Sequence, residues 1–470
     1  MLMDIGLEVH AELLTESKMF CSCSSAFGAE PNANCCPVCL GLPGTMPLLN
    51  ERVPALAVRA GLALGCQVSR VTSFDRKNFF YPDLPKGFQI SQLYFPICTS
   101  GALPVETDSG VRKIAIRELH MEDDAGKLIH KDGVTYADYN RCGVPLIEIV
   151  TEPDMHSPEE AAAFVRELIG LLTYAGISDC RMQEGSLRVD VNLSVRENKN
   201  APLGIRTEMK NLGSIRAVSR AVRYEAKRQV ELISAGMKIS RETRRWDEEK
   251  EITVALREKE ETGGYRYFPE PDIPPLSISE EFIENERQMI PELPMKRRSR
   301  YMSDWGISRQ DSYTLTAEKY VAEFFEYTVR AGVKPAEAAK WICADLLRIW
   351  KTSAMGKMSP KRLAALIHMT NSGVVSRATA REMLIPMHQS ELEPQEYAAS
   401  LGLGKVSAKK DVETAVNAVL AANSEKVLQY KSGKDKLWTY LFGKVMKELG
   451  GKGEPTVISA VLKELIEKEK

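Results

Sequence analysis

The sequence lacks the segments that direct a chain into or across a membrane. It has no basic stretch followed by an apolar run near its start, and no run of about 18 uncharged apolar residues. Secretion and membrane insertion are therefore not expected, and we predict a cytoplasmic location. The composition, 44% hydrophobic and 27% charged, is typical of a soluble globular protein, and 470 residues predict two to four domains.

Familiar nucleotide-binding and nucleophile motifs are also missing. The chain contains no glycine-rich phosphate loop, no Gly-x-Ser-x-Gly motif and no evident Cys–His arrangement. Internal repeats and low-complexity segments are absent as well. These absences argue against a phosphate-loop enzyme and a serine hydrolase. They leave open a phosphoryl transfer that needs only a metal ion and cationic side chains.

Net charge is nearly balanced, at −1, but it is unevenly distributed. Residues 405–470 contain 13 lysines, no arginine and 9 acidic residues, whereas the first 404 residues contain 50 basic and 55 acidic residues. A lysine-rich tail on a mildly acidic body fits contact with a phosphate backbone. An ordinary solvated helical surface is the alternative, and charge alone favours it.

Residues 1 to about 290 alternate between strand and helix patterns. Ile5 to Leu13 and Leu187 to Val195 each place apolar side chains on one face and polar side chains on the other, as half-buried strands do. Ser157, Pro158 and Glu160 predict a capped helix that ends at Gly176. A second helix is expected over residues 214–236. The pattern predicts an α+β fold on a largely antiparallel sheet.

Proline and glycine mark the expected domain boundaries. The segment Tyr267–Pro275 predicts irregular structure and, with Pro291 and Pro294, a boundary near residue 290. Beyond residue 295 the pattern is helical, as in 317–331 and 335–351. A second break falls at Leu401–Gly404, and a loop is expected at Tyr430–Lys436. We therefore predict domains at 1–290, 291–404 (all-α) and 405–470 (a small helical tail).

Half of the ten cysteines lie between residues 21 and 39. Cys21-x-Cys23 and Cys36-x-x-Cys39 form two close pairs that can surround a tetrahedral zinc ion, and the spacing favours Cys36 over its neighbour Cys35. Four thiolates leave no open position for substrate, so the role would be structural. Free thiols, or a site that has lost its metal, are the alternatives. The other five are expected to be reduced core residues: Cys66, Cys98, Cys142, Cys180 and Cys343.

Three segments carry carboxylates in strand patterns. Glu8 and His10 share a polar strand face, the acidic run Glu118–Asp124 ends a strand that begins near Ile114, and Glu148 lies in the apolar run Gly143–Val150. A buried carboxylate needs a cation, and carboxylate oxygens with one imidazole favour Mg²⁺ or Mn²⁺ over zinc. Surface acids at strand ends are the alternative.

A further segment, Phe74–Gln92, is dense in aromatic and cationic side chains and could hold a phosphate and a planar base. Together with other motifs it resembles the B subunit of the aspartyl/glutamyl-tRNA amidotransferases, and the resemblance extends over the whole chain. The remaining motifs that carry it are Ile5–His10, Phe27–Asn32, Leu119–Lys127, Glu184–Arg188, Tyr265–Asp272 and Tyr430–Lys434.

The resemblance implies a two-stage reaction. An amidase A subunit releases ammonia from glutamine, and a small C subunit holds A and B together. The B subunit uses ATP to phosphorylate the side-chain carboxylate of Glu-tRNA(Gln) or Asp-tRNA(Asn), and ammonia then displaces the phosphate. By this resemblance the N-terminal domain is the catalytic cradle, and a helical domain and a tRNA-binding tail follow it.

Carried over by position, the resemblance assigns roles to individual residues. It implies catalytic roles for Glu8, His10, Asp123, Glu148 and Asp190, and Mg²⁺ or Mn²⁺ ligation by Glu8, His10, Glu122, Asp123 and Glu148. It implies an ammonia route along Lys77 and Lys86, and tRNA contacts in the tail by Lys431, Lys434 and Lys436. The family often has Glu-Glu-Asp where this chain has Glu122–Asp124, so contact of the shorter Asp123 with metal is expected through water. Only some members have zinc cysteines, and this chain has all four.

Two other functions remain open at this point. A non-catalytic, zinc-stabilised tRNA-binding scaffold would share the cysteines and the tail, but would not need acids and an imidazole on strand faces. A metal hydrolase would explain neither the tail nor the length. A related archaeal subunit carries an inserted domain that is not evident here.

Overall fold

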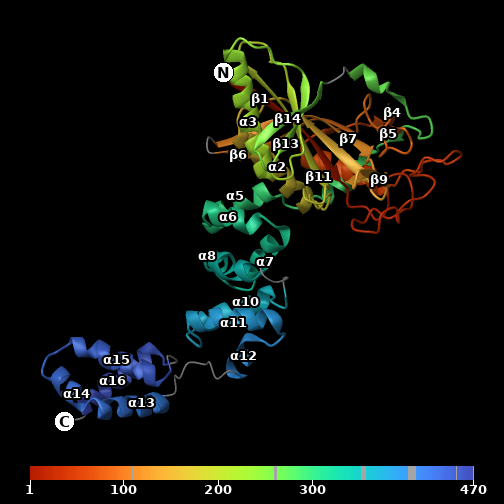
Figure 1. Cartoon of the computed structure of the whole chain (residues 1–470). Coiled ribbons are helices and arrows are strands. Elements are labelled where there is room, and N and C mark those ends of the chain that lie inside the picture. Colours follow the sequence, from red (N-terminus) through yellow and green to blue (C-terminus); the bar gives the residue numbers. More distant parts are fainter. Residues whose placement is uncertain (108–109, 259–261, 351–355, 401–408, 451–452, 469–470) are drawn as a thin grey trace. The chain divides into compact units, whose positions relative to one another are not determined.

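The computed structural model describes all residues except 108–109, 259–261, 351–355, 401–408, 451–452 and 469–470. It divides into two compact units, Met1–Arg297 and Arg298–Lys470 (Figure 1). Among the residues that the structure describes, no helix is both long and apolar enough to cross a membrane.

The first unit is built on a nine-stranded sheet with the order β14-β13-β12-β11-β1-β10-β7-β6-β2 (Figure 1). Every neighbouring pair is antiparallel except β12 and β13, so the predicted α+β fold on a largely antiparallel sheet is confirmed. The strands are β1 (Leu2–Glu12), β2 (Gln67–Val68), β6 (Cys98–Thr107), β7 (Gly110–Asp123), β10 (Pro145–Thr151), β11 (Leu187–Arg196), β12 (Thr207–Lys210), β13 (Glu242–Asp247) and β14 (Ile252–Glu258).

One face of this sheet packs against helices and forms the core. The odd-numbered residues of β1 and β11 are buried there, from Ile5 to Ala11 and from Leu187 to Val195. They share one apolar cluster with residues of the helices α1 (Arg52–Ala63), α2 (Pro158–Tyr174), α3 (Ile215–Ser234) and α4 (Glu280–Gln288). The alternation predicted from sequence is therefore the division between a helix-covered face and a polar face.

The ends of α2 follow the local sequence closely. Ser157 caps the helix by accepting the N–H of Glu160 at 3.1 Å. The Glu160 carboxylate accepts the N–H of His156 instead of that of Ser157, so the predicted capping box closes one residue earlier. At the other end Gly176, with φ +65°, allows Ile177 N–H to bond to Leu172 O at 2.9 Å. α3 likewise begins after a capping serine and ends before Gly236, as predicted.

Three small sheets border the large one. They are β4 (Asp75–Asn78) with β5 (Phe88–Ser91) and β15 (Phe268–Pro269), β3 (Val71–Thr72) with β16 (Leu276–Ser277), and the hairpin β8 (Lys127–Lys131) with β9 (Val134–Asp138). The 3-10 helix η1 spans Thr262–Tyr265. The prediction of irregular structure over Tyr267–Pro275 is wrong at β15, which pairs with β4. A proline is tolerated there because β15 is an edge strand.

The second unit is helical, as predicted, and contains two separate hydrophobic cores. One is formed by residues between Tyr301 and Ala398, the other by residues between Val412 and Ile466. The helices from the end of the first unit onward are α5 (Pro294–Trp305), α6 (Arg309–Thr316), α7 (Lys319–Arg330), α8 (Pro335–Trp341), the π-helix η2 (Ile342–Leu346), α9 (Leu347–Trp350), α10 (Pro360–Asn371), α11 (Arg377–Gln389), α12 (Pro394–Ser400), α13 (Lys409–Ala422), α14 (Ser424–Lys431), α15 (Lys436–Glu448) and α16 (Pro455–Lys468).

The expected boundaries compare with this architecture as follows. The unit boundary falls between Arg297 and Arg298, a few residues beyond the predicted 290. The predicted break at Leu401–Gly404 lies outside the described residues, and the three-domain division stays a prediction. The predicted loop at Tyr430–Lys436 is shorter, because α14 extends through Lys431 and α15 begins at Lys436.

Candidate active site and cysteine cluster

The polar face of the large sheet brings an imidazole, a carboxylate and a second imidazole into one row. The register pairs His10 of β1 with Glu148 of β10, and Glu148 with His120 of β7. Paired residues project to the same face of a sheet, so these side chains meet. The Glu148 Oε2 atom lies 3.4 Å from His10 Nε2 and 2.9 Å from His120 Nε2. The three carboxylate segments noted in the sequence therefore lie on adjacent strands.

Glu122 completes a possible cation site on this row. Its Oε1 atom is 3.5 Å from His10 Nε2. One ligand atom each from His10, Glu122 and Glu148 lies within 4.8 Å of the others. Two carboxylates and one imidazole suit a hard divalent cation such as Mg²⁺ or Mn²⁺.

The carboxylates of Glu122 and Glu148 favour a positive charge beside them. Burial alone would lower the pKa of the His10 imidazole, but Glu148 and Glu122 outweigh it and raise that pKa to about 9. Burial also opposes ionisation of Glu148, yet the two imidazoles hold the pKa of its carboxyl well below the usual value. Without a metal, a protonated His10 thus compensates part of the negative charge of the two carboxylates. A divalent cation bound by the same residues would compensate that charge instead.

Glu8 and Asp190 belong to a second acidic cluster on the same face. They are paired across β1 and β11, and Glu208 of β12 joins them with ligand atoms within 4.8 Å. Asn192 donates to Glu8 Oε1 at 3.0 Å, and Lys210 pairs with Asp190 and, at 3.3 Å, with Glu208. Glu8 is therefore on the predicted strand face but is grouped with Asp190, not with His10.

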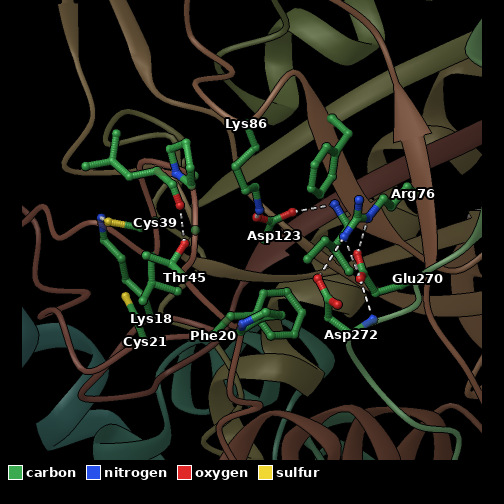
Figure 2. A pocket seen from close by; sticks show the side chains of 18 of the residues that line it. Lys18, Phe20, Cys21, Cys39, Thr45, Arg76, Lys86, Asp123, Glu270 and Asp272 are labelled. Carbon is green, nitrogen blue, oxygen red and sulfur yellow. Dashed lines mark hydrogen bonds and ion pairs between the residues drawn. The ribbon is translucent and has the colours of Figure 1, made fainter.

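Asp123 occupies a different position from the other predicted ligands. It follows Glu122 in β7, so its side chain projects to the opposite face of the sheet. There it forms an ion pair with Lys86 and accepts the N–H of Ile90 at 2.7 Å. Asp123 and Lys86 line a cavity of about 220 Å³ together with Arg76, which pairs with Glu270 and Asp272 (Figure 2). The structure does not bring Asp123 to the His10 row.

Lys77 faces the polar side of the sheet. It lines a hollow of about 460 Å³ together with His10, Glu122, Arg188, Asp190 and Lys210. Burial opposes its charge, but the nearby carboxylates of Glu122 and Glu148 raise the pKa of the Lys77 ammonium above its usual value. Its Nζ atom also lies 5.8 Å from the Phe79 ring centre and 5.3 Å from that of Tyr265. The hollow combines acids and cations, as a site for a metal-bound phosphate does.

Sequence reasoning missed several residues of this face. His120 was within the acidic run, two residues before Glu122 and hence on the same strand face, and that spacing was a usable signal. Glu208 and Lys210 lie on a four-residue strand without a readable alternation. Their contact with Glu8 and Asp190 depends on the pairing of β12 with β11.

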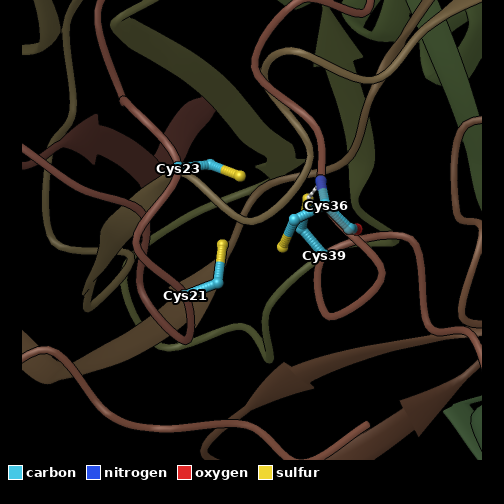
Figure 3. Close-up of side chains that lie close together, drawn as sticks. All are labelled: Cys21, Cys23, Cys36 and Cys39. Atoms are coloured by element: carbon cyan, nitrogen blue, oxygen red, sulfur yellow. Dashed lines mark hydrogen bonds between the residues drawn. The ribbon is translucent and has the colours of Figure 1, made fainter.

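The four predicted zinc ligands converge. The sulfur atoms of Cys21, Cys23, Cys36 and Cys39 lie within 4.8 Å of one another (Figure 3). A hydrogen bond from the Cys21 thiol is the main reason that the pKa of Cys39 is lowered to about 4, against the effect of burial. The backbone N–H of Cys36 also donates to Cys39 Sγ at 3.2 Å. Four cysteines in this arrangement fit a tetrahedral zinc ion.

The remaining predicted residues are placed as follows. Cys35 is outside the four-sulfur group, as the spacing predicted. Cys66, Cys98, Cys142 and Cys180 are buried, whereas Cys343 is half-buried. In the tail, Lys431 and Lys434 are exposed, and Lys436 begins α15 with its side chain outside the described part.

The polar face also predicts a pH dependence of stability. Burial and the neighbouring Asp124 raise the pKa of the Glu12 carboxyl from 4.5 to about 7. A carboxyl whose pKa is higher in the folded state stabilises the fold below its unfolded pKa, and this contribution is lost as pH rises through the folded pKa. Glu12→Gln should therefore raise the urea midpoint of the first unit relative to wild type at about pH 8, and less so at about pH 5.

Pulse proteolysis in urea measures this difference, with the exposed Glu16→Gln as control. A Glu12→Gln effect of equal size at both pH values would contradict the prediction, because it would not follow the ionisation of Glu12.

Comparison with known proteins identifies the chain. Residues 3–284 match the GatB/GatE catalytic domain, and residues 323–466 match the GatB domain. The aspartyl/glutamyl-tRNA(Asn/Gln) amidotransferase B subunit of Lachnoclostridium phytofermentans is 46% identical, over 99% of this chain and 98% of that protein. The proteins of the same name from Caldicellulosiruptor saccharolyticus and Thermoanaerobacter pseudethanolicus are each 45% identical, over 99% of this chain and 98% and 99% of those proteins. The chain therefore belongs to the family of aspartyl/glutamyl-tRNA(Asn/Gln) amidotransferase B subunits.

Proposed function

We propose that this chain activates the side-chain carboxylate of Glu-tRNA(Gln) or Asp-tRNA(Asn) in the hollow lined by His10, Glu122 and Lys77. Family membership makes it a subunit of a ligase that transamidates misacylated tRNA. The observation that carries the site assignment is the candidate cation site of His10, Glu122 and Glu148 beside the half-buried Lys77.

In the first step a carboxylate oxygen of the aminoacyl group attacks the γ-phosphorus of ATP, and ADP leaves. The protein contributes charge and position to this step, as phosphoryl transfer requires. Lys77, Arg188 and Lys210 line the hollow and offset negative charge on the phosphates. A Mg²⁺ or Mn²⁺ ion held by His10, Glu122 and Glu148 would neutralise phosphate charge. Glu8, Asp190 and Glu208 would hold a second cation or orient Lys210.

In the second step ammonia attacks the acyl carbon of the activated carboxylate, and phosphate leaves with formation of the amide. We assign the approach of ammonia to the cavity lined by Lys86 and Asp123 and the hollow lined by Lys77. Gln89 lines the hollow and donates to the Asp123 carbonyl at 2.8 Å, so it lies between the two spaces. The ammonia would come from an amidase A subunit, with a small C subunit completing the assembly.

The test is ATP cleavage by the reconstituted complex with and without Glu-tRNA. Activation predicts cleavage that depends on the charged tRNA and is accompanied by transfer of ammonia. A scaffold role predicts tRNA binding by this chain with tRNA-dependent cleavage unaffected when His10 or Glu148 is replaced.

The lysine-rich tail is proposed to bind tRNA mainly through phosphates. Removing residues 405–470 leaves the core formed between Tyr301 and Ala398 intact, because the tail core shares no residue with it. The truncated chain should bind tRNA more weakly and with a flatter dependence on salt, because each lost phosphate contact reduces counterion release. Binding measured at several salt concentrations tests this.

A variant that keeps the tail but removes three of its charges tests the contribution of charge to tRNA binding without the effect of a truncation on folding. Replacing Lys431, Lys434 and Lys436 by glutamine should reduce the salt slope by up to about three, roughly one per phosphate contact. Glutaminase activity of the partner subunit serves as the control and should persist. An unchanged affinity and slope in both variants would exclude the tail as the tRNA contact.

A further inference from the structure

A buried lysine lies beside the cysteine cluster. Lys18 has 0% of its surface exposed. Its three ammonium protons match three acceptors, namely Asn34 O at 2.7 Å, Tyr139 O at 3.2 Å and Cys39 Sγ at 3.6 Å. Within the described part of the chain, no carboxylate forms an ion pair with Lys18, in contrast to Lys86 and Lys210.

The buried ammonium group of Lys18 requires a neighbouring anion. Two carbonyl oxygens satisfy hydrogen bonds but do not compensate the charge of a buried ammonium, which is costly to remove from water unless it is paired. Among these three acceptors, the sulfur of Cys39 is the atom that can carry negative charge. A zinc ion with four thiolates has a net charge of about −2, so such a site itself requires a nearby cation.

We propose that Lys18 is the outer-sphere cation of the zinc site, donating to the Cys39 thiolate and compensating part of the charge of the four sulfurs. This inference rests on the zinc assignment and not on the activation of tRNA. It makes Lys18 a positioning residue for the metal, because neighbours of this kind orient ligands and tune metal affinity.

The same lysine connects the metal loop with the cavity of the proposed ammonia route. Asn34 belongs to the cysteine loop, Tyr139 follows β9, and Lys18 lines the cavity together with Lys86 (Figure 2). Loss of zinc would remove the metal that fixes the Cys39 sulfur in front of the Lys18 ammonium at this wall. The zinc site would thus stabilise the wall of that cavity as well as its own loop.

The test is the zinc affinity of the full chain, measured by competition with a chromophoric chelator. Lys18→Met keeps the length and apolar packing of the side chain and removes its charge and donors. It should weaken zinc binding by about 10- to 100-fold, the usual cost of losing an outer-shell partner. Lys18→Gln keeps a donor without charge and should fall between Met and wild type. Lys127→Met, on the exposed side of β8, makes the same change of charge and should leave the affinity unchanged.

A spectroscopic readout separates this role from simple packing. In the Co²⁺-substituted chain, loss of the N–H···S hydrogen bond should shift the thiolate-to-metal absorption band of Lys18→Met to lower energy, while Lys127→Met retains the wild-type band. The proposal is overturned if wild type holds one zinc and both Lys18 variants bind it within about twofold of wild type with an unshifted band. Wild-type protein that binds no zinc would overturn the zinc assignment and this inference together, without bearing on tRNA activation.

Discussion

Glu148→Gln is expected to lower tRNA-dependent ATP cleavage by about 100-fold or more, which corresponds to about 2.7 kcal/mol or more of transition-state stabilisation. Glutamine keeps the shape of the side chain and can still bond to His120 and His10, but it has no negative charge. The two imidazoles would then face a neutral amide, and a divalent cation at this row would lose one of its two carboxylate ligands. The rate is measured with Glu-tRNA and ATP in the reconstituted complex.

Two comparisons make this result specific. Basal glutaminase activity, measured in the same complex, should persist, because the proposed role of these residues is activation and not ammonia production. Glu152→Gln provides the matched control. It makes the same change four residues further along, where Glu152 forms a solvent-exposed pair with Arg117 at 2.9 Å, and it should leave the rate nearly unchanged. If Glu148→Gln, Glu8→Gln and His10→Ala all retain near-normal cleavage, the polar face is structural and the site assignment is wrong.

Cys39→Ser is expected to abolish stoichiometric zinc binding and to destabilise the first unit. Wild-type protein made with sufficient zinc should contain about one zinc per chain. Metal binding by four thiolates is coupled to folding, and a loss of about 3 kcal/mol would lower the melting temperature by roughly 5–10 °C in a unit of this size. Metal analysis and thermal melting measure the two effects. Activity per folded molecule should change less than stability, because a metal held by four thiolates has no open position for substrate.

The neighbouring cysteine offers the control for this experiment. Cys35 lies outside the four-sulfur group, so Cys35→Ser should retain the zinc and the melting temperature of wild type. Wild-type protein without zinc, with freely titrating thiols in the cluster, would contradict the assignment. The cluster would then be a set of free cysteines.

Local patterns in the sequence predicted several elements, among them β1, β11 and α2, and the grouping of the four cysteines. The strict alternation of Ile5–Leu13 predicts which face of β1 is buried, and Ser157 with Gly176 delimits α2, because these features depend only on nearest neighbours along the chain. The spacing of the four cysteines is similarly local, since each pair is held by a short turn. The resemblance to the family supplied the reaction, which no local pattern contains.

The composition of the polar face was decided by the tertiary structure. Alternation places His10 and Glu148 on strand faces, but only the register between β1, β10 and β7 makes them neighbours of each other and of His120. The same register separates Glu8 into a cluster with Asp190 and Glu208, and the alternation of β7 turns Asp123 toward Lys86. A strand pattern has a period of two residues, so it determines the face of a side chain but not its partner. The partner depends on which strands pair and in what register. Packing of the shared apolar face against the helices selects that pairing, and β1 pairs in this way with β10 and β11, both more than a hundred residues away in the sequence.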